Sequence, residues 1–210
     1  MNGFYTIKDN TRAEILERKS KFIATLCHIE SVEEAEKIIR QTRRKYYDAR
    51  HNCFAYRVME EKNIKEKFSD DGEPSGTAGA PMLNILQKNN LANVLVIVTR
   101  YFGGILLGTG GLLRAYSDSL ISAINKADLV KMFLGRQLQA VLDYSEFENF
   151  KYYCKKNGIS IMDCQYIENI VCLLNVEEIK INKLMEDFET KAINLKSLEI
   201  ISQKFMNKSI

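Results

Sequence analysis

The chain has 210 residues and a mass of 24.2 kDa, which suits one large domain or two small ones. Its hydrophobic fraction of 46% and charged fraction of 27% exclude a disordered protein, and a net charge of +3 neither demands nor excludes a nucleic-acid partner. No apolar run reaches the ~18 residues that a membrane helix needs, so we expect no membrane contact.

In the first half of the chain, strand patterns alternate with helix patterns. The predicted strands are 4–8, 12–28 as one bent strand, 51–58, a short strand at 64–68, and 93–101. Helices are predicted from the capping box Ser31–Glu34 to about Tyr46, over 77–90, and from the loop after 101 to about Ala127. The near-continuous apolar run 93–101 is typical of a buried central strand.

The second half predicts a βαββαβ order, which is the ferredoxin-like pattern. Its elements are strand 136–144, helix 145–156, strand 159–165, strand 168–176, helix 177–189 and strand 193–205. From Lys131 onward the chain has eleven basic and eleven acidic residues, so the excess charge lies earlier. We therefore predict two domains, 1–132 and 136–210, and an α+β fold class.

Glycine is concentrated in one part of the chain. Eight of the eleven glycines lie between Gly72 and Gly111, in two loops that each lead into a predicted helix. A helix N-terminus offers unpaired amides and a partial positive charge, which can bind phosphate or carboxylate, and an arginine fork suits the same anions. The predicted anion or ligand site comprises Ser75, Gly76, Thr77, Gly79, Arg100, Gly103, Gly104, Gly108, Thr109, Gly110, Gly111 and Arg114. The alternative is that these residues serve only tight packing and ordinary helix caps.

Three acidic residues, Asp70, Asp71 and Glu73, lie in the first loop. They could bind Mg²⁺ or another cation. A D-D-G-E-P sequence is more often a turn in which Asp side chains bind nearby backbone amides, and we favour that interpretation.

Cysteine and histidine do not predict a metal or cofactor site. The five cysteines form no C-x-x-C pair, and only two histidines are present, so we expect free thiols in a reducing cytoplasm, no metal and no cofactor. Charges near the N-terminus, where a secretory signal would be apolar, agree with a cytoplasmic location. His51 and Cys53 could form a nucleophilic pair, but a buried thiol without that role is the favoured interpretation.

A basic patch is predicted near the end of the first helix. It comprises Arg40, Arg43, Arg44, Lys45 and Arg50, beside Tyr46 and Tyr47. Such a mixture could bind RNA phosphates and stack a base. Basic residues also favour a helix C-terminus for electrostatic reasons, and that explanation alone suffices.

Two long segments carry a resemblance to a known family. They are SDDGEPSGTAGAPML at 69–83 and VLVIVTRYFGGILLGTGGLLRAYSDSL at 94–120, with further matches at 19–24 and 49–56. Over about residues 1–130 the chain resembles the YigZ/IMPACT family. The resemblance implies a first domain like the second domain of ribosomal protein S-five, with a mixed sheet and helices on one side. It also implies a second domain like the last domain of elongation factor G.

Eukaryotic members of this family act in translational control, so the resemblance implies a translation-linked binding role. We hypothesise a cytoplasmic, non-catalytic regulator that binds RNA, the ribosome or a ribosome-associated protein through the two glycine loops. The alternative is a phosphotransfer-like enzyme that binds a small molecule or nucleotide with the same loops, and it rests on fold analogy. A third possibility is a protein-binding module that exposes Phe102, Ile105 and Leu106.

Overall fold

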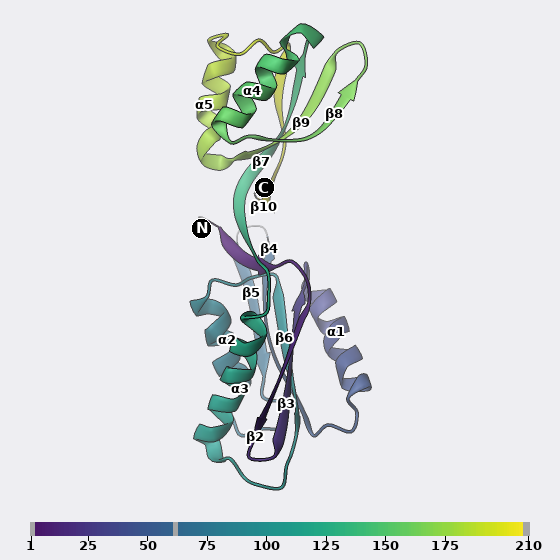
Figure 1. Cartoon of the computed structure of the whole chain (residues 1–210), viewed down its shortest axis with the longest axis vertical. Coiled ribbons are helices and arrows are strands. Elements are labelled where there is room, and N and C mark those ends of the chain that lie inside the picture. The colour runs from purple at the N-terminus through teal and green to yellow at the C-terminus, as the bar shows by residue number, and fades with distance from the viewer. Residues whose placement is uncertain (1–2, 61–62, 208–210) are drawn as a thin grey trace. The chain divides into compact units, whose positions relative to one another are not determined.

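The structure is a computed structural model that describes residues 3–60 and 63–207 (Figure 1). The chain divides into two compact units, Phe4–Val130 and a second unit that begins at Lys131. No helix among the described residues is both long enough and apolar enough to cross a membrane.

The first unit is built on a five-stranded sheet with three helices. Its elements are β1 (Phe4–Ile7), β2 (Thr11–Glu17), β3 (Ser20–His28), α1 (Val32–Lys45), β4 (His51–Glu60), β5 (Asn63–Ser69), α2 (Gly79–Lys88), β6 (Val94–Tyr101) and α3 (Gly108–Ile124). The sheet order is β2-β3-β6-β4-β5, and every neighbouring pair is antiparallel. β1 lies beside the end of α2, where the Ala92 amide donates to the Tyr5 carbonyl.

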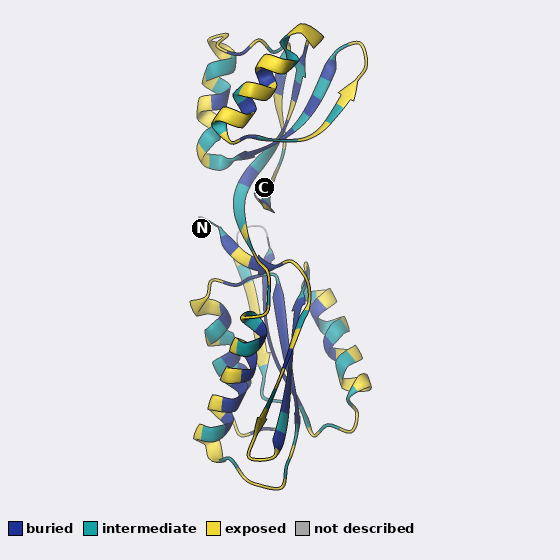
Figure 2. Cartoon of the chain, viewed as in Figure 1, coloured by how far each residue is buried: buried dark blue, intermediate teal, exposed yellow. Residues whose placement is uncertain are grey.

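Helices cover both faces of this sheet. Side chains of α2 and α3, such as Met82 and Tyr116, pack on the face of β6 that presents Val96. Ala35 and Ile39 of α1 pack on the opposite face, against Leu95, Ile97 and their neighbours. β4 and β6 are consequently buried along almost their whole length, as Figure 2 shows for the centre of the sheet.

The α+β class is confirmed, and two details of the expected sheet are wrong. The sheet is antiparallel rather than mixed, and its helices lie on both sides rather than one. The helices lie on both sides because the apolar run of β6 has no polar alternation, and such a strand must be covered on both faces.

Most predicted elements of the first unit are present with small shifts at their ends. Ser31 caps α1, and its Oγ accepts from the Glu34 amide at 3.1 Å, while Glu34 Oε2 accepts from the Glu30 amide at 2.8 Å. The expected single bent strand over 12–28 is wrong, because β2 and β3 form a hairpin. Its two turn residues, Arg18 and Lys19, have φ of 44° and 64°. Two residues with positive φ give the turn that suits a two-residue hairpin, although neither is the usual Asn or Gly.

The second unit has the expected βαββαβ order. Its elements are β7 (Leu129–Leu142), the short 3₁₀ helix η1 (Tyr144–Glu146), α4 (Phe147–Asn157), β8 (Ser160–Tyr166), β9 (Ile170–Glu177), α5 (Glu178–Glu189) and β10 (Ser197–Asn207). The strands are ordered β10-β7-β9-β8, all antiparallel, with α4 and α5 packed on one face. This arrangement is ferredoxin-like. β7 begins at Leu129 rather than 136.

Candidate functional site

The first glycine loop, 69–79, is closed by its own carboxylate. The side chain of Asp70 accepts hydrogen bonds from the amides of Gly76 at 2.9 Å, Ala78 at 3.0 Å and Gly79 at 2.8 Å. These amides include the first ones of α2, and an Asp side chain satisfies them as a helix cap does. The amides predicted to bind an anion are therefore already occupied. Ser75 is exposed, whereas Thr77 is buried and donates to the Pro74 carbonyl.

Asp71 also serves the turn rather than a cation. Its carboxylate accepts from the Asn52 amide at 2.7 Å and forms an ion pair with Arg43. Its backbone carbonyl lies 2.8 Å from Nδ1 of His51, and since a carbonyl can only accept, that nitrogen carries the proton. Within the described ranges no three His, Cys, Asp or Glu residues are grouped as metal ligands. The geometry agrees with the turn interpretation of the acidic run.

Glu73 is the centre of a buried polar cluster. Its Oε1 lies 2.7 Å from Nη1 of Arg100 and accepts from the Tyr116 hydroxyl at 2.9 Å. Nε2 of His51 lies 4.0 Å from the same oxygen. Burial, foremost, and the nearby Cys53 and Glu73 raise the pKa of Tyr116, so its hydroxyl stays protonated and donates. The cluster joins the loop to β4, β6 and α3.

Arg100 lies inside the fold rather than at an anion-binding surface. It is only 6% exposed, and its guanidinium lies 5.4 Å from the ring centre of Phe22 and 5.6 Å from that of Phe102. Its Nη2 donates to Ser20 Oγ at 3.4 Å, and its Nε is buried without a hydrogen-bond partner among the described residues. The expectation that Arg100 contacts a phosphate does not agree with this position, because its charge already faces Glu73.

Cys53 belongs to the same buried cluster and is not an activated nucleophile. Its Sγ donates to the Asp70 carbonyl at 2.9 Å and contacts the Tyr116 hydroxyl at 3.3 Å. Burial raises the pKa of this thiol to about 12, so it stays protonated at neutral pH. Because the thiolate is the reactive form, the geometry favours the structural interpretation of Cys53.

The second glycine loop, 102–111, is open. The first turn of α3 follows Leu107 and has no side-chain cap, and Gly108, Thr109 and Gly110 are exposed. Gly104 and Gly108 have φ of 85° and 71°, which L side chains rarely adopt. Gly103 differs from them, because a Cβ there would lie 2.0 Å from the carbonyl carbon of Lys19. The loop is thus fastened to the β2–β3 turn at one point and is free of close contact at Gly104 and Gly108.

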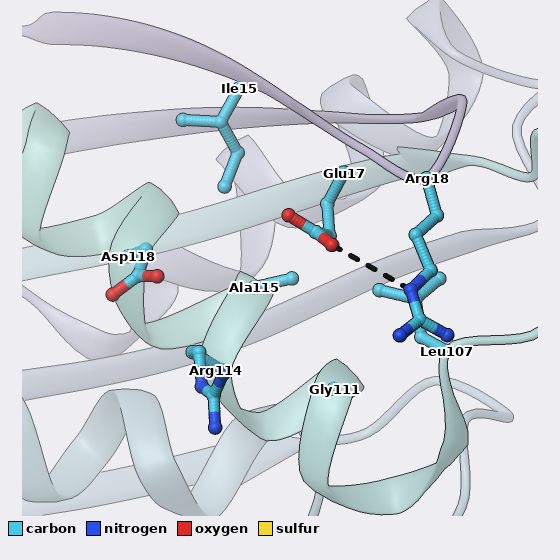
Figure 3. A pocket seen from close by; sticks show the side chains of 8 residues that line it. All are labelled: Ile15, Glu17, Arg18, Leu107, Gly111, Arg114, Ala115 and Asp118. Atoms are coloured by element: carbon cyan, nitrogen blue, oxygen red, sulfur yellow. Dashed lines mark ion pairs between the residues drawn. The ribbon is translucent and has the colours of Figure 1, made fainter.

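A small pocket of about 110 Å³ lies between α3 and the β2–β3 hairpin (Figure 3). It is lined by Ile15, Glu17, Arg18, Leu107, Gly111, Arg114, Ala115 and Asp118. Arg114 is exposed and has no ion pair among the described residues, while Arg18 lies 4.0 Å from Glu17. Arg18 was not among the predicted site residues, because nothing in the sequence brings it to the start of α3.

Apolar side chains are exposed on the loop that precedes Leu107, one of the residues that line this pocket. Phe102, Ile105 and Leu106 are 44%, 41% and 80% exposed. Together with Arg18 and Arg114 they form what we call the loop surface, which lies wholly in the first unit.

The basic patch at the end of α1 is at the surface. Arg40, Arg44, Lys45 and Arg50 are exposed, and Arg43 is the member that pairs with Asp71. Tyr47 is 86% exposed, and Nζ of Lys45 lies 5.4 Å from the ring centre of Tyr46. An exposed aromatic beside cations that, apart from Arg43, have no ion pair within the described part of the chain agrees with either interpretation of this patch.

The fold and the two loops define an α+β protein whose first unit presents one sealed and one open glycine loop. The model of the Impact N-terminal domain matches residues 18–124, and the chain belongs to the IMPACT family. The IMPACT family member YvyE of Bacillus subtilis is 36% identical over 197 residues, covering 94% of this chain and 90% of the relative. An IMPACT family member of Haemophilus influenzae is 33% identical, covering 89% of each chain.

A solved structure supports the same arrangement of elements. A crystal structure described as a hypothetical protein matches with a TM-score of 0.63 and 27% identity, covering 96% of this chain and 98% of the other. The family resemblance inferred from the two glycine-rich segments is thereby confirmed.

Proposed function

We propose that the chain is a cytoplasmic, translation-linked regulator that binds a ribosome-associated protein through the loop surface. The observation that carries the proposal is the exposure of Ile105 and Leu106 on the open loop. Two aliphatic side chains that are adjacent in the sequence, with Phe102 three residues before them, are exposed on one loop, and exposed apolar groups of this kind are typical of a protein contact.

Charge supports the choice of partner. Arg114 and Arg18 line the pocket next to Leu107. Arg114 has no ion pair among the described residues, and Arg18 has only the long contact of 4.0 Å with Glu17. Arginine suits interfaces because its planar guanidinium group can bind one carboxylate through two hydrogen bonds. We therefore expect a partner with apolar side chains next to acidic ones.

The link to translation rests on family membership. The resemblance implies that eukaryotic members act in translational control, and several curated relatives carry the name IMPACT, such as that of Rattus norvegicus. For direct RNA contact the loops are less suitable than the sequence suggested, because Arg100 is buried and Asp70 fills the first loop.

An enzyme that binds its substrate with these two loops is the weaker alternative. A pocket of about 110 Å³ is smaller than the ~300–1,000 Å³ typical of small-molecule sites. If the chain were a nucleotide-binding enzyme, nucleotide and Mg²⁺ would raise its melting temperature, because a ligand that binds the native state stabilises that state. We expect no such shift.

Ribosome co-sedimentation tests the proposal. Wild type is compared with Ile105→Ser/Leu106→Ser and with Arg18→Ala/Arg114→Ala, using crude ribosomes and ribosomes washed in high salt to remove associated proteins. The matched control, Arg40→Ala/Arg44→Ala, removes the same charge from the α1 patch.

We expect wild type to bind crude ribosomes and not washed ones, and the apolar variant to lose most binding. Binding to washed ribosomes that falls steeply with salt and is lost only in the α1 control would instead indicate RNA contact. Absence of binding to either preparation contradicts the translation link.

A further inference from the structure

Two cysteines face each other across neighbouring strands of the second unit. Cys164 of β8 is paired in register with Cys172 of β9, and their Sγ atoms lie 3.2 Å apart. Nothing in the proposed function uses these thiols, which lie at the core beneath α4 and α5.

The backbone already has the spacing that a disulfide needs. Directly opposed residues of antiparallel strands have Cα atoms about 4.5–5.5 Å apart, and disulfides span about 4.4–6.8 Å. Only the two sulfur atoms need to approach each other, from 3.2 Å to the ~2.05 Å of an S–S bond.

The two thiols differ in how an oxidant can reach them. Cys164 is the one cysteine of the five that is not buried, whereas Cys172 is fully buried. Burial and the hydrogen bond with Cys164 raise the pKa of Cys172 to about 12. Cys27, Cys53 and Cys154 are also buried, and burial raises the pKa of each. Exposure therefore favours attack at Cys164.

We propose that Cys164 and Cys172 are a reversible oxidation site that forms a cross-strand disulfide when the protein meets a hydroperoxide. The Cys164 thiolate attacks the O–O bond of hydrogen peroxide, takes one oxygen as sulfenic acid and releases hydroxide, which leaves as water. The Cys172 sulfur then attacks the Cys164 sulfur, the S–O bond breaks, and the departing hydroxide leaves as a second water with the Cys172 proton. Two thiols lose two electrons, and one peroxide is reduced to two waters.

The sequence makes the product easy to identify. No Lys or Arg lies between Cys164 and Cys172, so both fall in one tryptic peptide, and Glu168 lets a glutamate-specific protease cut between them. Cys154 falls in a separate tryptic peptide, because Lys155 follows it.

The experiment treats the full chain with hydrogen peroxide, unfolds it, alkylates the remaining thiols and maps the peptides, with and without dithiothreitol. Variants are Cys164→Ser, Cys172→Ser and, as the matched control from the same core, Cys154→Ser. Circular dichroism checks that each variant is folded, and dimedone traps sulfenic acid.

We expect wild type and Cys154→Ser to lose two alkylatable thiols, and dithiothreitol to restore both. The glutamate-specific digest should give two peptides joined through Cys164 and Cys172. In Cys172→Ser, Cys164 should instead be labelled by dimedone. Either a Cys154–Cys164 disulfide or dimedone-labelled Cys164 with free Cys172 in wild type would overturn the proposal.

Discussion

The two glycine loops of the first unit both lead into a helix, yet they have opposite structures. In the loop 69–79 the side chain of Asp70 binds the amides at the start of α2, and Glu73 is buried against Arg100. In the loop 102–111 the start of α3 has no side-chain cap, and Leu106 is 80% exposed. Glycine permits both outcomes, so the neighbouring carboxylates decide which loop is sealed.

The largest expected difference between the loops comes from their arginines. Arg100→Ala removes the partner of Glu73, and an unpaired buried carboxylate costs about 3–5 kcal/mol. Arg114→Ala, the control in the open loop's helix, should change the free energy of unfolding by less than about 0.5 kcal/mol. Urea unfolding measures both. Equal losses in the free energy of unfolding for the two variants would mean that Arg100 is no more important to stability than the exposed Arg114.

Glycine substitutions test how firmly the open loop is fastened. In Gly103→Ala the new Cβ would lie 2.0 Å from the backbone of Lys19, and such overpacking costs about 1–3 kcal/mol or more. In Gly110→Ala nothing lies within 4 Å of the new Cβ, and alanine in a helix should stabilise by about 0.4–1 kcal/mol. Opposite shifts in melting temperature are the expected result. Destabilisation by both would indicate that the loop is packed throughout.

A capping test compares the starts of the two helices. Asp70→Ala leaves three amides without their acceptor and should destabilise by about 0.5–2 kcal/mol, in the range of lost helix caps. Thr109→Ala at the start of α3 removes an exposed side chain that forms no hydrogen bond with the residues the structure describes, so it should be nearly neutral. Thermal unfolding of both variants gives the comparison. Asp70→Asn should fall between wild type and Asp70→Ala, and a neutral Asp70→Ala would contradict the capping role.

The smallest expected effect is a pH dependence of the sealed loop. The folded pKa of Cys53 is raised to about 12 from 9.0, so the fold favours the neutral thiol. This contribution is complete below pH 9 and decreases as the pH rises toward 12, with about 1 kcal/mol lost by pH 10. Cys53→Ala should show a correspondingly smaller loss of stability between pH 7 and pH 10 in urea unfolding. If wild type and Cys53→Ala lost the same stability between pH 7 and pH 10, the raised pKa of the Cys53 thiol would be contradicted.

The sequence predicted the elements better than the contacts of particular side chains. The apolar run 93–101, the capping box at Ser31 and the βαββαβ order depend on local patterns, and each is present. The hairpin turn at Arg18 and Lys19 was missed, because positive φ there is imposed by the pairing of β2 with β3 and not by a turn residue.

For the candidate site, the limits of the sequence lie in long-range pairing. Arg100 lies near the end of a strand that is buried on both faces, so alternation could not tell whether its side chain points to solvent. Its partner Glu73 comes from a loop far earlier in the chain, and only the antiparallel sheet brings the two together. The exposed residues Phe102, Ile105 and Leu106 were recognisable, because apolar residues in a glycine loop cannot all be buried.

The place of β6 at the centre of the sheet also determines the order in which this protein can fold. β3 pairs with β6 from Lys21↔Tyr101 to His28↔Val94, and β4 pairs with the other edge of the same strand. Neither strand has its central neighbour until residues 94–101 have been synthesised. A nascent chain that ends before Val94 therefore leaves one edge of β3 and one edge of β4 without their partner strand, and closure of the sheet must await a distant segment, which slows folding.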